Sequence, residues 1–227
     1  MYSRAIRRRP LPVGGCDFDE RHAGWPDRVK ERRRTEILNA AEAIAKARTW
    51  DALTMKHVAL RARRSRALIY VYFKNKTALL SGIRERGFAT LAHRFTEAVS
   101  RETTGIDQLI AIGRAYVAFS QEFPARFEAI ARSALRSERS EALTTSNQQA
   151  CHDILARAVE RGVSDSSIRS DVGDSRIVSS VFLAFIHGAL RSSMAKTSLP
   201  ARTHIIGVQV IEQALSMARR AMQGETA

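Results

Sequence analysis

The chain has 227 residues and a formal net charge of +14, a length sufficient to bury a core of ordinary size. No run of 18 apolar residues occurs, so we expect no membrane-spanning helix and no membrane partner. Cys16 and Cys151 lie in unrelated contexts, which predicts no disulfide framework and favours a reduced, cytoplasmic compartment. Six scattered histidines, no glycine-rich phosphate loop and no paired-carboxylate motif predict no metal, no cofactor and no enzyme.

The positive charge is concentrated in one segment. Residues 30–96 carry 16 basic and 5 acidic side chains, a net charge of +11, whereas residues 97–227 carry a net charge of only +1. Phosphate backbones attract such a segment, so the asymmetry indicates a module that meets a polyanion, joined to one that does not.

Residues 1–29 are rich in proline, glycine and arginine and show little periodicity. We therefore expect a disordered basic tail and no secretory signal. The run Arg7-Arg8-Arg9 has two interpretations: it follows a DNA backbone or enters a minor groove, or it is simply solvated.

A first helix is expected over about 27–47, because Ile37, Leu38, Ala41 and Ile44 recur at helical spacing. Its first turns carry several cations, among them Arg33. Cations at a helix start oppose the helix dipole, so an anion is expected nearby, with an ordinary exposed basic face as the alternative.

Two short helices follow, over about 54–61 and 65–72, and then a long helix over about 75–101. Thr54 and Ser65 are good N-caps for the short pair, since their hydroxyls can accept from free backbone N–H groups. Two short helices joined by a tight turn suit a helix-turn-helix, in which the second helix lies in the major groove of DNA.

The side chains of this segment suit contacts with DNA. Arginine can bind O6 and N7 of guanine together, and small residues let the backbone approach the bases. Tyrosine can donate to phosphates, and Lys76 is helped by the dipole at the start of the long helix.

Four motifs are specific in this region: Ile37-Leu38-x-Ala40-Ala41, Thr54-x-x-x-Val58-Ala59, Ala62 with Ser65, and Tyr70-Val71-Tyr72-Phe73-x-x-Lys76-x-x-Leu79. Through them, residues 33–80 resemble the DNA-binding domain of the tetracycline-repressor (TetR) family of bacterial transcription regulators. The resemblance implies that Tyr70 and Lys76 hold phosphates and that residues 65–68 face the groove. The candidate DNA contacts are Arg33, Thr54, Arg63, Arg64, Ser65, Arg66, Ala67, Leu68, Tyr70, Tyr72 and Lys76.

Two residues depart from the family pattern. Arg63 stands where glycine is usual, and Arg64 stands where an apolar residue is usual. If the turn needs a positive φ, arginine costs on the order of 1 kcal/mol relative to glycine. The two arginines are either additional DNA contacts or a weak joint between the two short helices.

The remainder of the chain shows helical spacing throughout, with helices expected over about 105–123, 124–135, 142–161, 175–195 and 201–222. The sequence thus predicts an all-α fold of about nine helices. Residues 30–80 are expected to form a three-helix DNA-binding domain with a helix-turn-helix, and residues 81–227 a helical domain for ligand binding and dimerisation.

The last two helices carry too much apolar surface for a single chain. The helix at 175–195 is apolar on nearly every face and is expected to be buried all round, and the stripe of 201–222 is too wide for one partner. Such excess suggests a subunit interface. The resemblance agrees, since regulators of this family dimerise through their last two helices.

Aromatic residues of the C-terminal half suggest an apolar ligand cavity, with His187 or Arg132 as a polar group, although an ordinary packed core explains them equally. The candidate ligand contacts are Tyr116, Phe119, Phe123, Phe127, Phe182, Phe185 and His187.

These observations predict a homodimeric, ligand-responsive transcription regulator that acts as a repressor. Two copies of the helix at 65–72 would enter major grooves of a palindromic operator about 34–36 Å apart, and a small molecule would release them. The alternative is a constitutive or architectural DNA-binding protein without a ligand.

Overall fold

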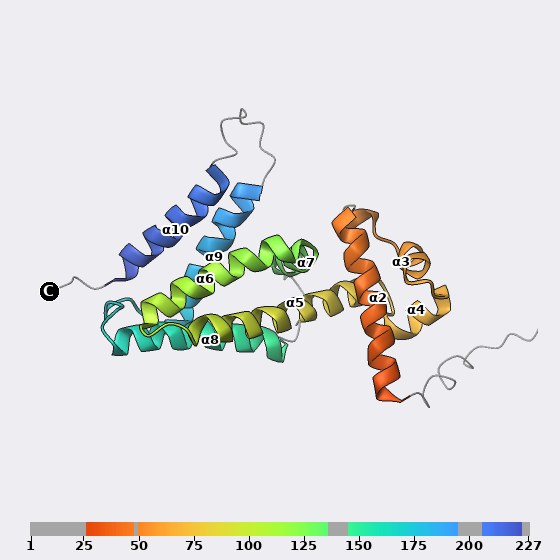
Figure 1. Ribbon diagram of the computed structural model, residues 1–227, viewed down its shortest axis with the longest axis horizontal. Coiled ribbons are helices and arrows are strands. Elements are labelled where there is room, and N and C mark those ends of the chain that lie inside the picture. Colours follow the sequence, from red (N-terminus) through yellow and green to blue (C-terminus); the bar gives the residue numbers. More distant parts are fainter. Residues whose placement is uncertain (1–25, 48–49, 136–144, 195–205, 224–227) are drawn as a thin grey trace, which may run out of the picture. The chain divides into compact units, whose positions relative to one another are not determined.

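The computed structural model describes residues 26–47, 50–135, 145–194 and 206–223. These residues form nine α-helices and one short 3-10 helix, without a strand, so the predicted all-α fold is confirmed (Figure 1). The elements are α2 (Asp27–Ala47), η1 (Trp50–Ala52), α3 (Met55–Ala62), α4 (Arg66–Tyr72), α5 (Lys76–Val99), α6 (Gly105–Glu122), α7 (Pro124–Leu135), α8 (Ser146–Ser164), α9 (Ser175–Met194) and α10 (Ile206–Met222).

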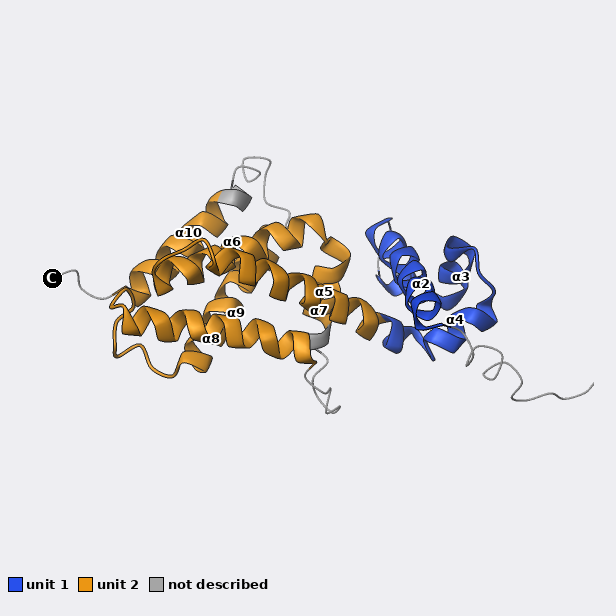
Figure 2. Cartoon of the chain, turned by 60° about the horizontal axis from the view of Figure 1, so that its bottom comes forward, with its two compact units in different colours: residues 1–79 blue, residues 80–227 orange. Residues whose placement is uncertain are grey.

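The chain divides into two compact units, residues 1–79 and 80–227 (Figure 2). Helix α5 contributes residues to both. The boundary expected from the sequence lies one residue further on, between 80 and 81. Residues 27–29, which the sequence assigned to the tail, belong to α2, and residues 1–25 lie outside the described part of the chain.

The N-terminal unit has a small core contributed by α2, η1, α3, α4 and the start of α5. The expected stripe of α2 is buried, and Trp50 and Leu53 between α2 and α3 are buried with it. Isolated helices of seven or eight residues are marginal in water, so α3 and α4 depend on this burial for their stability. The core includes Ile37, Leu38, Ala41, Ile44, Trp50, Leu53, Met55, Val58, Ile69, Phe73 and Leu79.

In the C-terminal unit, α6 packs against α7, α8, α9 and α10, and α9 packs against α8 and α10. The ribbon shows α6 among these helices (Figure 1). The core contains Phe95, Leu109, Ile112, Tyr116, Phe119, Phe127, Leu155, Phe182 and Ile186.

Helix α9 is not buried all round within one chain, contrary to expectation. Ile177, Val181 and Phe185 are 65%, 63% and 42% exposed. Helices α6, α8 and α10 pack against α9, and no described segment covers the side that carries these three residues. The apolar residues on that side lie at spacings of four and therefore form one stripe.

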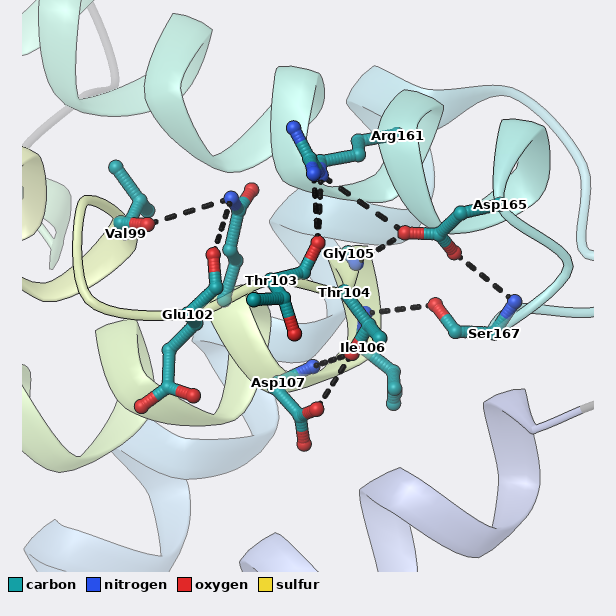
Figure 3. Close-up of polar contacts among 11 residues, drawn as sticks. Val99, Glu102, Thr103, Thr104, Gly105, Ile106, Asp107, Arg161, Asp165 and Ser167 are labelled. Carbon is teal, nitrogen blue, oxygen red and sulfur yellow. Dashed lines mark hydrogen bonds and ion pairs between the residues drawn. The ribbon is translucent and has the colours of Figure 1, made fainter.

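The N-terminus of α6 is held by the loop between α8 and α9 (Figure 3). The backbone N–H of Gly105 donates to Asp165 Oδ2 at 2.8 Å, and that of Ile106 donates to Ser167 Oγ at 3.1 Å. Thr104 caps the helix by accepting from the N–H of Asp107 at 3.3 Å. Three N–H groups that would otherwise lack partners at a helix start are thus paired.

Two further contacts fix this corner. The guanidinium of Arg161 donates to the carbonyl of Thr103 at 2.6 Å, and that of Arg219 on α10 donates to Asp107 Oδ1 at 2.6 Å. The sequence placed the end of α8 at about residue 161, but the helix continues to Ser164. Gly105 permits the close approach of α6 and α8, because a Cβ on it would overlap the backbone of Gly162, while a Cβ on Gly162 would overlap the side chain of Ile168.

Candidate functional site

Helix α4 presents the candidate DNA-reading face. Its N-cap is Ser65, whose Oγ accepts from the N–H of Leu68 at 3.2 Å, as the sequence predicted. Ile69 is fully buried and anchors the helix in the core, whereas Arg66, Ala67 and Tyr70 are exposed. One face of α4 therefore carries a cation, a small residue and a phenol toward solvent.

Leu68 corrects the expectation that residues 65–68 all face the groove. Its side chain is 7% exposed and belongs to the core. Leu68 is next to Ile69 and three residues after Ser65 in the sequence. Packing its apolar side chain into the core is more favourable than exposing it to water. The side chain of Leu68 thus has no access to base edges in this structure.

Thr54 caps α3, as predicted. It has an extended backbone, and its side chain accepts from the N–H of His57 at 3.2 Å. Its side chain is exposed next to the start of α3. Its contact with DNA stays a prediction, because the hydroxyl already has a structural role.

The turn between α3 and α4 is a Schellman motif, the hydrogen-bonded helix ending that contains a left-handed residue. Arg63 has φ 54° and ψ 46°, and its N–H donates to the carbonyl of Leu60 at 3.2 Å. The N–H of Arg64 donates to the carbonyl of Ala59 at 3.0 Å. The positive φ that the sequence considered is therefore present, and Arg63 carries the cost of about 1 kcal/mol expected of a non-glycine residue.

Arg64 occupies the position where such a motif usually places an apolar contact. Its Nη2 donates to Glu36 Oε2 at 2.7 Å, so a charged bridge to α2 replaces that contact. Sequence reasoning missed Glu36, because the two residues are 28 positions apart. The available signal was a carboxylate on the same helix as several arginines.

The hydrogen bond from Arg64 holds the pKa of Glu36 below its ordinary value, against the opposing effect of partial burial. Charges on Arg64, Arg32 and Arg33 lower the pKa further. Glu36 is therefore ionised at neutral pH, and Arg32 Nε lies 3.7 Å from its Oε1.

The two phosphate-holding candidates are differently placed. Tyr70 is 44% exposed and directs no described hydrogen bond into the protein. Lys76 begins α5 and its Nζ lies 3.4 Å from the carbonyl oxygen of Asp51, a long contact that a phosphate can replace. Asn75 caps the same helix by accepting from the N–H of Ala78 at 2.8 Å.

Tyr72 and Arg33 are less accessible than the sequence suggested. Both side chains are half-buried, and the hydroxyl oxygen of Tyr72 is itself buried. Burial raises the pKa of Tyr72, with Arg33 acting in the opposite direction and Glu36 in the same direction. Tyr72 thus belongs to the contact between α4 and α2, and its role toward DNA stays a prediction.

In the C-terminal unit, three candidate ligand contacts form one polar-aromatic cluster, Tyr116, Phe127 and His187. The hydroxyl of Tyr116 and Nδ1 of His187 are 2.8 Å apart, within hydrogen-bond distance. The ring centroid of Phe127 lies 5.7 Å from that of Tyr116 and 5.3 Å from that of His187. Helices α6, α7 and α9 each contribute one member.

Charged residues border this cluster. Arg191 Nη1 donates to Glu128 Oε2 at 2.6 Å, and Arg132 Nε donates to Glu128 Oε1 at 3.0 Å. Arg132, one of the two expected polar groups, therefore pairs with a carboxylate in this structure. Burial lowers the pKa of His187, Arg191 lowers it further, and Glu128 opposes them.

The other candidate aromatics do not all join the cluster. Phe119 and Phe182 are buried in the core, and Phe123 is half-buried with the guanidinium of Arg126 4.5 Å from its ring centroid. Phe185 is two residues from His187, which corresponds to a rotation of about 200° around the helix axis. It therefore points away from His187 and lies on the exposed side of α9. Phe185 therefore does not line the same space.

We expect His187 to make the stability of the C-terminal unit depend on pH. The folded protein holds its pKa below the ordinary value of 6.5, so the unfolded chain binds a proton first as the pH falls. Stability should be fully present above about pH 6.5 and decline below it toward the folded pKa. The His187→Gln protein should show a flatter profile in urea unfolding at pH 7.5, 6.5 and 5.5. Identical pH slopes would contradict the assignment.

The residues that the structure describes contain neither a cluster of metal-binding side chains nor a membrane-spanning helix. No three His, Cys, Asp or Glu side chains there group closely enough to hold a metal ion. No helix among those residues is long and apolar enough to cross a membrane. Cys151 is buried, its thiol contacts the carbonyl of Phe88 at 3.5 Å, and burial raises its pKa to about 12.

Comparison with known families gives a match that lies largely in the N-terminal unit. The model of the family described as "Bacterial regulatory proteins, tetR family" matches residues 37–83, which run from α2 into α5. No curated protein matches the chain. The matched segment contains the turn and the exposed face of α4.

Solved structures extend the likeness to both units. A tetR-family regulatory protein from Rhodococcus RHA1 is 22% identical, covers 82% of this chain and 96% of its own, and has a TM-score of 0.61. SmeT, the repressor of the Stenotrophomonas maltophilia multidrug efflux pump SmeDEF, is 23% identical, with 85% and 91% covered and a TM-score of 0.60. A SmeT–triclosan complex matches with 21% identity, 86% and 93% coverage and a TM-score of 0.60. At these identities the likeness establishes a common fold.

Proposed function

We propose that this chain is a homodimeric, ligand-responsive transcription repressor of the cytoplasm, because residues 37–83 match the model of the tetR family of bacterial regulatory proteins. The observation that carries the proposal is the face of α4. Arg66, Ala67 and Tyr70 are exposed there, on a helix whose start is fixed by Ser65. Such a helix can lie in a major groove, where arginine and small residues read base edges.

The distribution of charge supports binding to DNA. Residues 30–79 carry 13 basic and 4 acidic side chains, a net +9 of the +11 in residues 30–96, so the unit that carries α4 also carries the attraction for phosphates. Tyr70 and Lys76 would hold the backbone on either side of the groove. Phosphate contacts position the helix, and contacts to bases supply the specificity.

The exposed stripe of α9 supports a dimer. Ile177, Val181 and Phe185 are accompanied on α10 by Met217, which is 50% exposed. Apolar stripes on two packed helices are suited to a self-complementary interface. A two-fold dimer would hold two copies of α4 about one turn of DNA apart and so select a palindromic operator.

The cluster of Tyr116, Phe127 and His187 supports a small-molecule effector. It combines aromatic surface with a hydrogen-bonding pair, the combination that binds an apolar ligand carrying one polar group. The solved complex of SmeT with triclosan is an example of a small molecule bound to a protein of this fold. The effector would act only through its difference in affinity for the DNA-bound and released arrangements.

A constitutive DNA-binding protein is the second candidate, because one observation favours it. Tyr116 and His187 already form a hydrogen bond with each other, and Tyr116 and Phe127 are 3% and 1% exposed. A satisfied, close-packed cluster needs no ligand. Thermal shifts with a library of apolar and cationic compounds separate the two, since only the ligand-responsive protein should be stabilised by a compound and then lose operator affinity.

Selection of duplexes from a random pool tests the DNA-binding function directly. The purified dimer should enrich a palindrome whose half-sites are 10–10.5 base pairs apart, centre to centre, or a multiple of it. Enrichment of no common sequence would overturn specific binding, and retention of no duplex would overturn DNA binding altogether.

The combined substitution Tyr70→Phe and Lys76→Ala tests the phosphate contacts. Losing two contacts should weaken binding to every duplex. The salt slope should fall by about 0.9, the value for the Lys76 cation alone, because the contact of the uncharged Tyr70 hydroxyl releases no counterion. Salt titrations of the wild-type and variant proteins measure it. The matched control is Lys46→Ala, another exposed cation of the same unit at the far end of α2. A folded variant that binds the operator as tightly as the wild type would refute these two assignments.

A further inference from the structure

The bridge between Glu36 and Arg64 lies beside the start of the DNA-reading helix. Arg64 directly precedes Ser65, the N-cap of α4, and is bound through its Nη2 to Glu36 on α2 at 2.7 Å. The second carboxylate oxygen of Glu36 lies 3.7 Å from Nε of Arg32. One carboxylate thus engages two guanidinium groups of the most basic segment of the chain.

The bridge is open to water and can therefore be exchanged. The side chains of Arg64 and Glu36 are 34% and 36% exposed. They border a surface groove of about 560 Å³ lined by Glu36, Asn39, Ala40, Ala43, Arg61, Ala62, Arg63 and Arg64. Ion pairs at such exposure contribute only about 0–1 kcal/mol, so a nearby phosphate can compete for the same guanidinium.

From this geometry, we propose that Glu36 limits sequence-independent binding to DNA by holding Arg64 in the turn. The inference rests on the proposed DNA-binding function and adds a specificity-determining residue to it. With Glu36 ionised, the Arg64 guanidinium stays on α2 and fixes the start of α4. Without the carboxylate, Arg64 is released to contact a phosphate.

The effect falls on non-specific binding because phosphates carry no sequence information. A released arginine adds a contact that every duplex offers equally. Specific binding also requires α4 to begin where it does, and that position depends on the turn held by the bridge. Releasing Arg64 should therefore raise non-specific affinity more than operator affinity, and the ratio between them should fall.

The test compares Glu36→Gln with wild-type protein on an operator duplex and on a duplex of unrelated sequence, in salt titrations. For the unrelated duplex, the salt slope should steepen by about 0.9, the value for one additional phosphate contact. At about 0.1 M salt this corresponds to a gain of about five- to tenfold in non-specific affinity. Operator affinity should rise by less.

Two controls isolate the bridge. Glu31→Gln removes the same charge from an exposed position of the same helix, and it should leave the slope within error of wild type. Arg64→Val places an apolar residue in the turn. Adding Glu36→Gln to it should no longer change the slope, since Arg64 is gone and Arg32, 69% exposed and 3.7 Å from the carboxylate, is already open to phosphates.

Each other outcome overturns the proposal. Equal steepening by Glu36→Gln and Glu31→Gln would mean that only the total charge matters. A lower melting temperature of Glu36→Gln with an unchanged slope would mean that the bridge is structural alone. If wild-type protein binds neither duplex, the proposed DNA-binding function fails instead, which this comparison separates from failure of the role of Glu36.

Discussion

Val181→Glu is expected to convert the proposed dimer into monomers and to weaken operator binding by about 10²- to 10⁴-fold. The side chain is 63% exposed in the single chain, so the glutamate should leave the fold of each protomer intact. In the dimer it would be buried against apolar surface, where an unpaired charge is strongly unfavourable. A monomer loses the gain that comes from binding two half-sites together.

Sedimentation velocity and operator titration measure the two parts of this result. Ala118→Glu is the matched control, since Ala118 is an exposed alanine of α6 away from the stripe of α9. It should remain dimeric with unchanged operator affinity. A Val181→Glu protein that sediments as a dimer would show that the exposed side of α9 is not the interface.

Gly105→Ala is expected to have the largest effect on stability. A Cβ at this position would overlap the backbone N and Cα of Gly162 and approach the carbonyl oxygen of Ala158. Backbone atoms in two helices cannot move aside as a side-chain end can. The added carbon should therefore separate α6 from α8 and disturb the hydrogen bonds that the backbone of α6 donates to Asp165 and Ser167 (Figure 3).

We expect a loss of about 3 kcal/mol or more, the upper part of the range for overpacked cores. For a unit of this size that lowers the melting temperature by about 6–12 °C. Circular dichroism follows the helices of both units, whereas fluorescence of the buried Trp50 follows the N-terminal unit. The first signal should shift and the second should shift less.

Gly87→Ala is the matched control for a glycine within a helix. Its Cβ would lie 2.9 Å from Cδ1 of Ile130, the end of a flexible side chain that can rotate away. Alanine is also favoured over glycine by about 1 kcal/mol within a helix. A change within about 1 kcal/mol is expected. If Gly105→Ala is equally mild, the corner is not held as closely as the structure indicates.

Predictions that depended on neighbouring residues succeeded. The caps Thr54 and Ser65 each accept from an N–H three residues on, so local sequence alone was enough to place them. A positive φ at Arg63 was considered as a condition, because glycine usually stands there, and the structure has it; Pro124 begins α7 as expected. In each case the interacting groups are close in sequence.

Predictions that depended on which face a residue occupies were less reliable. Leu68 was expected in the groove and packs in the core, while Phe185 was expected near His187 and lies on the opposite side of α9. Both belong to helices with apolar residues on several faces. Helical periodicity alone cannot tell which apolar face is buried, because the neighbouring helices decide which of the faces is covered.

By itself, the sequence determined the all-α class, the helix caps and the concentration of charge that marks the N-terminal unit. Only the tertiary structure decided the pairing of Arg64 with Glu36, of Tyr116 with His187, and of Gly105 with Asp165, which join residues 28, 71 and 60 positions apart. Caps and helical periods arise from bonds within one turn of chain. The three pairings arise from helix packing, which brings distant residues together and has no local signature.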